Sequence, residues 1–358
     1  PPLTIGRGVL PPALAVFGIL QYLLHSGYEV FGELPGLARK VLILGTGPLA
    51  NQMGAVIVAS GAEYKLSGYV RCSSDRVEVP ADNILADEGG LMDTVRREKA
   101  EHIVVSLSER RGVFPIHDVM KCRLSGVDVM DAPTFYEQVT GKLWVENLTP
   151  SSFIFSTGFR IGWLSRRCKR AIDVAASTAG LLFISPFLPL VALLIKLDSR
   201  GPALFSQERV GEGEKRFMLY KFRTMRTDAE AASGAVWATE NDPRVTRLGR
   251  FLRKSRIDEI PQLFNVIRGD MSLVGPRPER PEFVEKLKEV VPYYSERHFV
   301  KPGVTGWAQV RYPYGASVED ALEKLRYDLY YIKNFSLLFD LMILADTIKV
   351  VLFRRGGR

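Results

Sequence analysis

The 358-residue sequence predicts an α/β protein in which a parallel-sheet domain precedes a mostly helical, membrane-associated domain. Short β-branched runs alternate with helical patterns as far as residue 148, and this alternation is typical of a parallel sheet. A long run without charged side chains, Val174 to Ile195, then follows a basic cluster and is long enough to enter a bilayer. From Gly201 onward the chain is rich in arginine, glycine and proline, and we expect this part to carry the chemistry.

Composition indicates a globular protein with an anionic partner. Hydrophobic residues make up 46% of the chain and charged residues 25%. The net charge of +8 suits nucleic acid, anionic lipid headgroups or phosphorylated substrates, and composition does not choose between them. Cys72, Cys122 and Cys168 show no paired spacing, which argues against a disulfide framework or a zinc site.

Residues 1–38 predict the remnant of a transmembrane helix and a linker. Val9 to Leu24 carries no charged side chain, and Arg39-Lys40 follow, as at the end of a membrane helix with a basic cytoplasmic flank. The alternative is an amphipathic or disordered leader, because Pro11-Pro12 interrupt a run shorter than the roughly 20 residues that span a bilayer.

Residues 39–148 predict a Rossmann-like domain. The first strand, Val41 to Leu44, ends in Gly45-Thr46-Gly47-Pro48-Leu49-Ala50, which matches G-x-G-x-x-A and can place a pyrophosphate at a helix N-terminus. The dinucleotide fingerprint also expects a carboxylate at the end of the second strand, where this chain has Val70-Arg71. We therefore favour a structural or regulatory domain over an NAD enzyme. Further strands are expected at 66–70, 83–85, 102–106 and 127–130, and helices at 48–60, 91–98 and 117–125.

After a linker at 149–165, the apolar run from Val174 to Ile195 predicts a re-entrant membrane helix. Ser185-Pro186 interrupts it, because proline removes a backbone donor and kinks a helix, and the Ser185 hydroxyl can satisfy the freed carbonyl. Both flanks, 166–170 and 196–200, contain basic residues, so the positive-inside rule gives no direction of crossing. A helix that enters, bends and leaves on one face explains both features. A buried core hairpin is the alternative.

Two adjacent carboxylates, Asp258 and Glu259, lie among the arginines of the second domain. Guanidinium groups bind phosphate with bidentate geometry, so this density of arginine suits a substrate with several phosphates, whereas no nucleic-acid module is recognisable. Either Ser255 caps a helix whose third residue is Asp258, or Pro261 begins a later helix. In both cases an anion is favoured near Asp258, and a carboxylate held ionised beside arginines can attack phosphorus. The plain alternative is a solvated surface pair.

Four ordered stretches in this half of the chain form one pattern. They are GPALFSQERVG (Gly201 to Gly211), KFRTM (Lys221 to Met225), NDPRVTRLGRFLRKSRIDEIPQLFNVIRGDMSLVGPRP (Asn241 to Pro278) and KPGVTGWAQV (Lys301 to Val310). Together with Arg170, Asp173 and the Ser185-Pro186 break, they resemble the bacterial sugar transferase family, the polyprenyl-phosphate hexose-1-phosphate transferases that begin exopolysaccharide and O-antigen synthesis. The resemblance covers residues 166–358, and the parallel-sheet domain resembles the accessory domain of the longer members.

The resemblance implies a two-step reaction on the cytoplasmic face of the bacterial inner membrane. Asp258 would attack the sugar-bearing phosphate of a UDP-sugar and release UMP, and polyprenyl (undecaprenyl) phosphate would then take the phosphosugar from the aspartate. Glu259 matches the ligand of Mg²⁺, the expected cofactor, and Arg277 matches a phosphate ligand. Secondary substrate contacts are expected from Lys221, Arg223, Arg209 and Gln309. Membrane lipids surround the domain, a homodimer is expected, nucleic acid is not a partner, and the sugar is not specified.

The C-terminal segment from Tyr327 to Phe353 predicts an interfacial amphipathic helix, with a packed core helix as the alternative. Its apolar residues near one helical face are Leu337, Leu338, Leu341, Leu344 and Ile348, and Arg354-Arg355 follow.

Two other classes of function stay open from the sequence. One is an NAD(P)-binding oxidoreductase that uses the Gly45-Gly47 turn, and the other is a nucleotide-sensing regulatory membrane protein whose transferase half is inactive. Binding of NAD without release of UMP would favour the first. Binding of nucleotide without turnover would favour the second.

Overall fold

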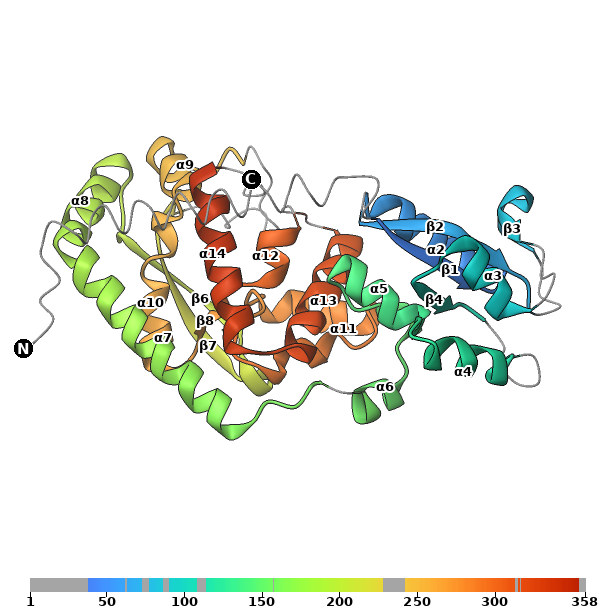
Figure 1. Ribbon diagram of the computed structural model, residues 1–358. Coiled ribbons are helices and arrows are strands. Elements are labelled where there is room, and N and C mark those ends of the chain that lie inside the picture. The colour runs from blue at the N-terminus through green and yellow to red at the C-terminus, as the bar shows by residue number, and fades with distance from the viewer. Residues whose placement is uncertain are drawn as a thin grey trace, which may run out of the picture. The chain divides into compact units, whose positions relative to one another are not determined.

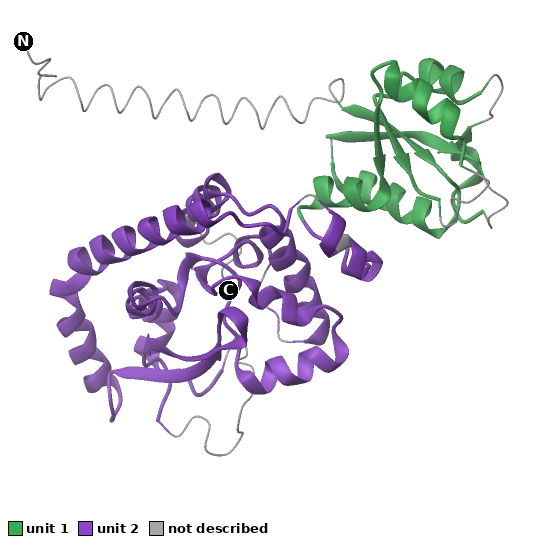
Figure 2. Cartoon of the chain, turned by 90° about the horizontal axis from the view of Figure 1, so that it is seen from below, with its two compact units in different colours: residues 1–141 green, residues 142–358 purple. Residues whose placement is uncertain are grey.

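The computed structural model describes residues 38–353 except 62, 73–76, 86–89, 108–113, 157, 228–241, 313, 314 and 316. The expected membrane-helix remnant, Asn241 and the basic Arg354-Arg355 lie outside the described residues. The chain divides into two compact units, Pro1–Gly141 and Lys142–Arg358, which Figure 2 shows in different colours. The sequence suggested that the first domain ends at residue 148, whereas the observed division falls earlier. The reason is that Leu143 and Val145 pack in the core of the second unit.

The first unit is a five-stranded parallel sheet with helices, which confirms the predicted α/β class (Figure 1). The strand order is β3-β2-β1-β4-β5, so the chain reverses direction across the sheet between β1 and β4. The strands are β1 (Arg39–Leu44), β2 (Tyr64–Val70), β3 (Ile84–Leu85), β4 (His102–Val105) and β5 (Asp128–Asp131). The helices are α2 (Pro48–Ala59), the short η1 (Ala81–Asn83), α3 (Leu91–Glu98), α4 (Ile116–Leu124) and α5 (Ala132–Thr140).

Alternation along β1 and β4 explains why helices cover both faces of this sheet. Leu42 and Leu44 on β1 pack with Ile103 and Val105 on β4 against α3 and α4. Their neighbours in sequence point to the opposite face, and α2 and α5 pack side by side there against the strands. Helix α5 was not expected from the sequence. Asp131 caps it by accepting a hydrogen bond from the Thr134 amide at 3.1 Å.

The second unit is mostly helical, as expected, with two small sheets. Strands β6 (Leu204–Val210) and β7 (Arg216–Phe222) form an antiparallel hairpin, and β8 (Ser272–Val274) pairs in parallel with β9 (Gly303–Thr305). The helices are α6 (Pro150–Phe155), α7 (Trp163–Ile184), α8 (Leu188–Asp198), α9 (Arg247–Lys254), α10 (Gln262–Arg268), α11 (Pro281–Val290), α12 (Trp307–Arg311), α13 (Val318–Lys333) and α14 (Leu337–Phe353). Short 3-10 turns are η2 (Val145–Asn147), η3 (Ser185–Phe187), η4 (Glu212–Glu214), η5 (Ile257–Glu259) and η6 (Tyr294–Phe299).

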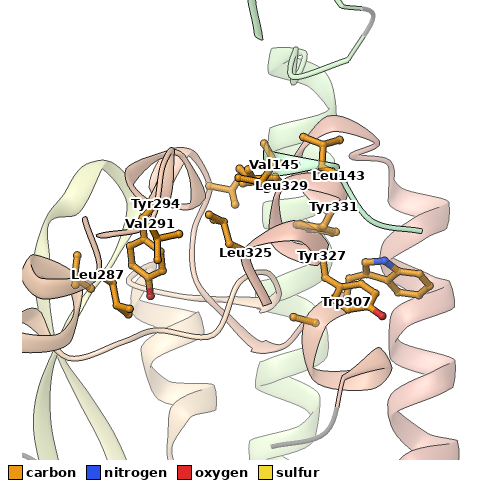
Figure 3. Packing of buried hydrophobic residues seen from close by; sticks show 14 of the residues in the cluster. Leu143, Val145, Leu287, Val291, Tyr294, Trp307, Leu325, Tyr327, Leu329 and Tyr331 are labelled. Atoms are coloured by element: carbon orange, nitrogen blue, oxygen red, sulfur yellow. The ribbon is translucent and has the colours of Figure 1, made fainter. Parts of the chain in front are cut away.

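The core of this unit is built around α13, as Figure 3 shows. Leu325, Leu329 and Tyr331 are buried on this helix, and Trp307 of α12 packs edge-on against Phe339 of α14 at 5.0 Å between ring centroids. A capping box of Ser317 and Asp320 begins α13. This core holds η6, α12 and α14 together and so fixes the loops that reach the site.

The C-terminal segment forms two helices where the sequence suggested one. Helix α13 ends at Lys333 and α14 begins at Leu337. On α14, Phe339 and Ile343 are buried in the core, whereas Leu338 is 77% and Ile348 60% exposed. One face of α14 therefore packs in the core, and another face exposes apolar side chains. The helix thus combines features of a packed core helix and of an interfacial helix.

The run from Trp163 to Asp198 is helical, and it is long and apolar enough to cross a membrane. Only 6% of its apolar 18-residue stretch is buried. Its two parts, α7 and α8, meet at an angle at η3 (Figure 1). Pro186 has no amide to donate, and the Ser185 hydroxyl donates instead to the Leu182 carbonyl at 2.9 Å, which is the compensation that the sequence suggested. The far end of α8 packs against the rest of the second unit, where Ile195 contacts Phe222 and Leu252.

Candidate active site

Asp258 and Glu259 lie in η5, a tight turn between α9 and α10. Ser255 does not cap a helix that contains Asp258; its hydroxyl donates to the Phe251 carbonyl and closes α9. Arg256 then takes a left-handed conformation with φ of 57°, which reverses the chain into the turn. Helix α10 begins directly after Pro261, close to the second of the two predicted arrangements. The two carboxylates are thus placed by a strained turn and not by the first turn of a helix.

Glu259 is the centre of a cluster of positive charge. Its Oε1 lies 3.1 Å from Arg277 Nη2, 3.4 Å from Arg256 Nη1 and 3.6 Å from Lys221 Nζ, while the residue is 7% exposed. Burial disfavours its ionised form, but the charges of Arg277, Lys221 and Arg256 together lower the pKa of Glu259 to about 2. Glu259 is therefore a carboxylate at neutral pH.

Asp258 is held differently from its neighbour. It is also 7% exposed, and its Oδ1 is buried without a hydrogen-bond partner among the described residues. Burial, and then the charge of Glu259, raise the pKa of Asp258 above its ordinary value, although Lys221, Arg253 and Arg277 act in the opposite direction. This direction of the pKa shift differs from the expectation that the arginines dominate, because burial and the charge of Glu259 outweigh them. A buried oxygen without a partner is an uncommon and costly feature in a protein interior.

Lys221 reaches the cluster from the β6–β7 hairpin. Burial, and then the neighbouring charge of Arg277, lower the pKa of Lys221 to about 8. Asn265, a fully buried residue of α10, holds the hairpin in place. Its Oδ1 accepts from the Tyr220 amide at 3.1 Å, and its Nδ2 donates to the Met218 carbonyl at 2.7 Å. This side chain was not identified from the sequence, because only the fold brings it beside the strand.

Arg277 lies in the loop after β8, and glycines allow this loop to pack closely. A Cβ on Gly275 would lie 2.3 Å from the Lys301 carbonyl oxygen, and one on Gly306 would lie 2.1 Å from the Gly275 carbonyl oxygen. Backbone hydrogen bonds from Gly275 to Thr305 and from Gly303 to Pro276, both at 2.9 Å, join the two loops. The K-P-G-V-T-G stretch therefore serves to hold the loop that carries Arg277.

Helix α7 is attached to α10 and β8, the two elements that follow the carboxylates in the chain. Arg170 donates to the carbonyls of Val266 and Ile267 at the end of α10, and Asp173 accepts from the Leu273 amide at 3.1 Å. Asp173 is 4% exposed, so this contact is a buried one. Helix α7 is thus joined by hydrogen bonds to the helix that follows the η5 turn and to β8.

The other expected substrate contacts lie in different surroundings. Arg223 is buried and donates to the carbonyl and hydroxyl of Ser199, just past α8, at 2.6 and 3.1 Å. Arg209 donates to Gln207 at 2.7 Å and lies 4.0 Å from Glu279, and burial lowers the pKa of Arg209 to about 10. Gln309 donates to the Val304 carbonyl at 3.2 Å, and its Oε1 is buried without a partner among the described residues. Lys221 and Arg277 are therefore the predicted contacts that the fold brings to the carboxylates.

A metal at this site would depend on the carboxylate of Glu259. In the described part of the chain, no three His, Cys, Asp or Glu side chains gather in a way that could hold a metal ion. Mg²⁺, however, commonly takes one or two protein carboxylates and completes its shell with water and substrate phosphates. The ionised carboxylate of Glu259 fits such an ion, and it leaves the unpartnered Oδ1 of Asp258 available to a substrate.

Comparison with known proteins places this site in a family. Residues 164–354 match the family model described as bacterial sugar transferase. The UDP-N-acetylgalactosamine-undecaprenyl-phosphate N-acetylgalactosaminephosphotransferase of Aeromonas hydrophila is 42% identical over 241 residues, which are 66% of this chain and 55% of that protein. The undecaprenyl-phosphate glucose phosphotransferase of Komagataeibacter xylinus is 38% identical over 331 residues, 90% of this chain and 60% of that protein.

A shorter relative is matched along nearly its whole length. The exopolysaccharide production protein PSS of Rhizobium leguminosarum bv. phaseoli is 46% identical over 194 residues, which are 53% of this chain and 97% of that protein. The present chain thus spans 55% and 60% of the length of the two longer relatives and nearly all of the shorter one. The family resemblance seen in the motifs is confirmed, and the chain belongs to the bacterial sugar transferase family.

Proposed function

We propose that this protein transfers a sugar 1-phosphate from a UDP-sugar to polyprenyl (undecaprenyl) phosphate, releases UMP and so begins the synthesis of an exopolysaccharide or O-antigen. The observation that carries the proposal is the η5 turn, where a buried carboxylate with an unengaged oxygen adjoins a carboxylate surrounded by three cations. The named relatives from A. hydrophila and K. xylinus are phosphotransferases that act with undecaprenyl phosphate, which supports the same reaction class.

In the first step, Asp258 acts as the nucleophile. Its Oδ1 forms a bond to the phosphorus that bears the sugar, the bond from that phosphorus to the UMP oxygen breaks, and UMP leaves with the electron pair. Arg277 and Lys221 bind the oxygens on which negative charge accumulates. In the second step, a phosphate oxygen of the lipid attacks the same phosphorus, and the bond to Asp258 breaks, which restores the carboxylate.

Glu259, which is ionised and adjoins the nucleophile Asp258, is the residue that would hold Mg²⁺. When bound, the ion supplies positive charge to the phosphoryl oxygens. Glu259 also contacts Arg277 and Lys221, so the groups that bind phosphoryl oxygens lie beside the carboxylate that would hold the ion.

We further propose that α7 and α8 enter the cytoplasmic leaflet of the bacterial inner membrane and return to the same side. Arg170 attaches the beginning of this run to α10, and Arg223 attaches its end at Ser199, so both ends are fixed to one catalytic unit. A straight crossing would place these ends on opposite faces. The exposed apolar side chains near the bend include Leu182, Phe183, Phe187 and Leu190.

The chemical proposal is tested by the order of product release. Enzyme and UDP-sugar alone should release up to one equivalent of UMP, and the peptide that contains Asp258 should carry the phosphosugar. Release of UMP that depends strictly on the lipid acceptor would contradict an accumulating aspartyl intermediate. A panel of UDP-sugars in the same assay identifies the donor.

The membrane path is tested separately by labelling single cysteines at positions flanking α7 and α8. Both flanks should be labelled from the cytoplasmic side only. Changing Ser185 and Pro186 together to leucine should straighten the helix, since it removes the kink and the hydroxyl that satisfies the Leu182 carbonyl. Labelling of the two native flanks from opposite sides would contradict the re-entrant path.

A further inference from the structure

Behind Arg277, a second arginine is buried in the core of the catalytic unit. Arg297 of η6 is 5% exposed, and Asp328 of α13 is 2% exposed. Arg297 Nε and Nη2 both donate to Asp328 Oδ2, at 3.1 and 2.7 Å. Its Nη1 donates to the hydroxyl of Tyr294 at 2.7 Å, and its guanidinium lies 5.1 Å from the centre of that ring. The Arg297 side chain is therefore held in a single orientation.

This fixed guanidinium has one more contact, which leads to the active site. Arg297 Nη2 donates to the backbone carbonyl of Arg277 at 3.0 Å. The side chain of the same Arg277 reaches Glu259 at 3.1 Å. A chain of direct contacts thus runs from Asp328 in the core through Arg297 to the loop whose arginine lies at the carboxylates.

Stability alone gives a weak reason for this arrangement. Asp328 occupies a core-facing position of α13 among buried apolar neighbours such as Leu325 and Leu329. Apolar residues of similar volume in place of a buried ion pair are often neutral or stabilising, because two charges must lose their water. Burial raises the pKa of Asp328 to about 6 even beside Arg297, which reflects this desolvation. The feature that an apolar replacement would lack is the hydrogen bond to the Arg277 carbonyl.

We propose that Arg297, fixed by Asp328 and Tyr294, is a positioning residue that sets Arg277 for binding the diphosphate of the donor. The inference rests on the proposed function, in which Arg277 binds phosphoryl oxygens. Close packing of Gly275 against Gly306 fixes one side of the Arg277 loop, and Arg297 fixes the other. The loop therefore needs no ligand to place its arginine, so less ordering is required when the diphosphate binds.

A double-mutant cycle tests this coupling in the full chain in detergent or nanodiscs. Calorimetry measures the affinity for inorganic pyrophosphate with Mg²⁺ in the wild type, Arg277→Ala, Arg297→Lys and the double variant. Lysine keeps the charge beside Asp328 but lacks the planar fork that reaches both Asp328 and the Arg277 carbonyl. Arg297→Lys should weaken pyrophosphate binding about tenfold, and the double variant should bind no more weakly than Arg277→Ala alone.

The control is another buried ion pair of the same unit. Lys169 and Asp340 are 2.7 Å apart, and neither contacts the Arg277 loop in the interactions described. Asp340→Asn should lower the unfolding temperature and leave pyrophosphate affinity unchanged. If Arg297→Lys does not fold, Tyr294→Phe removes only the hydroxyl that fixes Nη1, and it should weaken binding by about threefold.

Several results would overturn the assignment. They are wild-type affinity in Arg297→Lys, additive losses in the double variant, or pyrophosphate binding that Arg277→Ala does not weaken. Pyrophosphate binding needs no turnover. If the wild type releases no UMP, the proposed reaction is contradicted, but the affinities for pyrophosphate can still be compared. A positive cycle would then still show Arg297 positioning an anion-binding Arg277.

Discussion

The two units of the chain differ most in how they treat charge. In the described part of the first unit, the buried polar residues are Thr46, Thr94, His102 and Ser106, and no Asp, Glu, Lys or Arg is buried. The second unit buries Asp173, Arg223, Asp242, Asp258, Glu259, Arg297, Asp328 and Asp340. Removal of charges from water is unfavourable unless each is paired, so a unit that buries this many charges has a use for them beyond stability, and it is the unit that contains the candidate active site.

The same contrast holds for the two turns that drew attention in the sequence. The Gly45 turn has φ of 128°, and a Cβ there would lie 2.7 Å from the Ser106 carbonyl oxygen, so glycine is required by packing. No side chain caps the helix that follows, and the end of β2 brings no carboxylate. The η5 turn has a left-handed Arg256 and gathers three cations at Glu259. A helix N-terminus is thus a weak indication of a site, and convergent charge is a strong one.

The largest effect is expected at Asp258. Asp258→Asn is nearly isosteric but cannot attack phosphorus, so UMP release should fall at least about 10³-fold with little change in unfolding temperature. Rapid-quench measurement of UMP with one equivalent of UDP-sugar reads the step directly. Activity near that of the wild type would contradict the covalent mechanism. The buried carboxylate of the second unit would then have no chemical role.

The second largest effect is expected for Glu259→Gln, which should lower UMP release about 10²-fold. The variant leaves Lys221, Arg256 and Arg277 without their common anion, and it removes a carboxylate from the expected Mg²⁺ site. The concentration of Mg²⁺ that gives half-maximal activity should therefore rise. A metal titration that coincides with the wild type would show that Glu259 balances charge without holding the ion.

The sequence predicted the strands of the first unit well, because alternating burial and β-branched residues carry that information locally. Expected and observed strands differ only at their ends, as at 66–70 against Tyr64–Val70. Helix α5 was missed although Asp131 and Pro133 signal its start. The break between α13 and α14 was missed because Asn334 to Ser336 interrupts the helix without a glycine or proline.

The site was predictable where a motif names its own residues and not where the fold brings distant ones together. Asp258, Glu259, Lys221 and Arg277 do converge as expected. Asn265 and Arg297 act through hydrogen bonds to the backbones of other segments, and no local pattern announces such contacts. Arg223 belongs to a motif and was expected to contact the substrate. In the structure its side chain instead donates a hydrogen bond to the Ser199 carbonyl, just after α8.

Asn265→Ala tests whether the placement of the charges in the second unit matters, because it changes none of the charges themselves. It removes the bonds to the Tyr220 amide and the Met218 carbonyl, two partly buried backbone groups, which lose these partners. We expect a loss of about 1–3 kcal/mol in unfolding free energy and about a tenfold loss of turnover as Lys221 shifts. Normal turnover at a reduced melting temperature would show that the hairpin does not position Lys221.

The stability of the second unit should depend on pH through His298, which is 7% exposed. Burial, and then the charge of Arg297, lower the pKa of His298 to about 4, below the ordinary value near 6.5. The unfolded chain therefore binds this proton first, so stability is complete above about pH 6.5 and falls as the pH drops towards 4, by at most about 3 kcal/mol. Urea unfolding of His298→Gln should show a shallower loss over this window, and equal slopes in both proteins would contradict the assignment.

The smallest effect is expected for a change in the Gly45 turn of the first unit. This change tests most directly whether the two units differ in function. The Thr46 hydroxyl is fully buried without a hydrogen-bond partner among the described residues. Thr46→Val keeps the volume and removes only this unpaired group, so the first unit should be unchanged or slightly more stable. UMP release should stay within about twofold of the wild type, because no charge or contact of the η5 turn is altered. The change is best read beside Asp258→Asn in the same preparation, with UDP-sugar varied to separate kcat from KM. A marked rise in KM on Thr46→Val would mean that the glycine turn binds part of a nucleotide after all, and that the first unit takes part in the reaction without burying a charge.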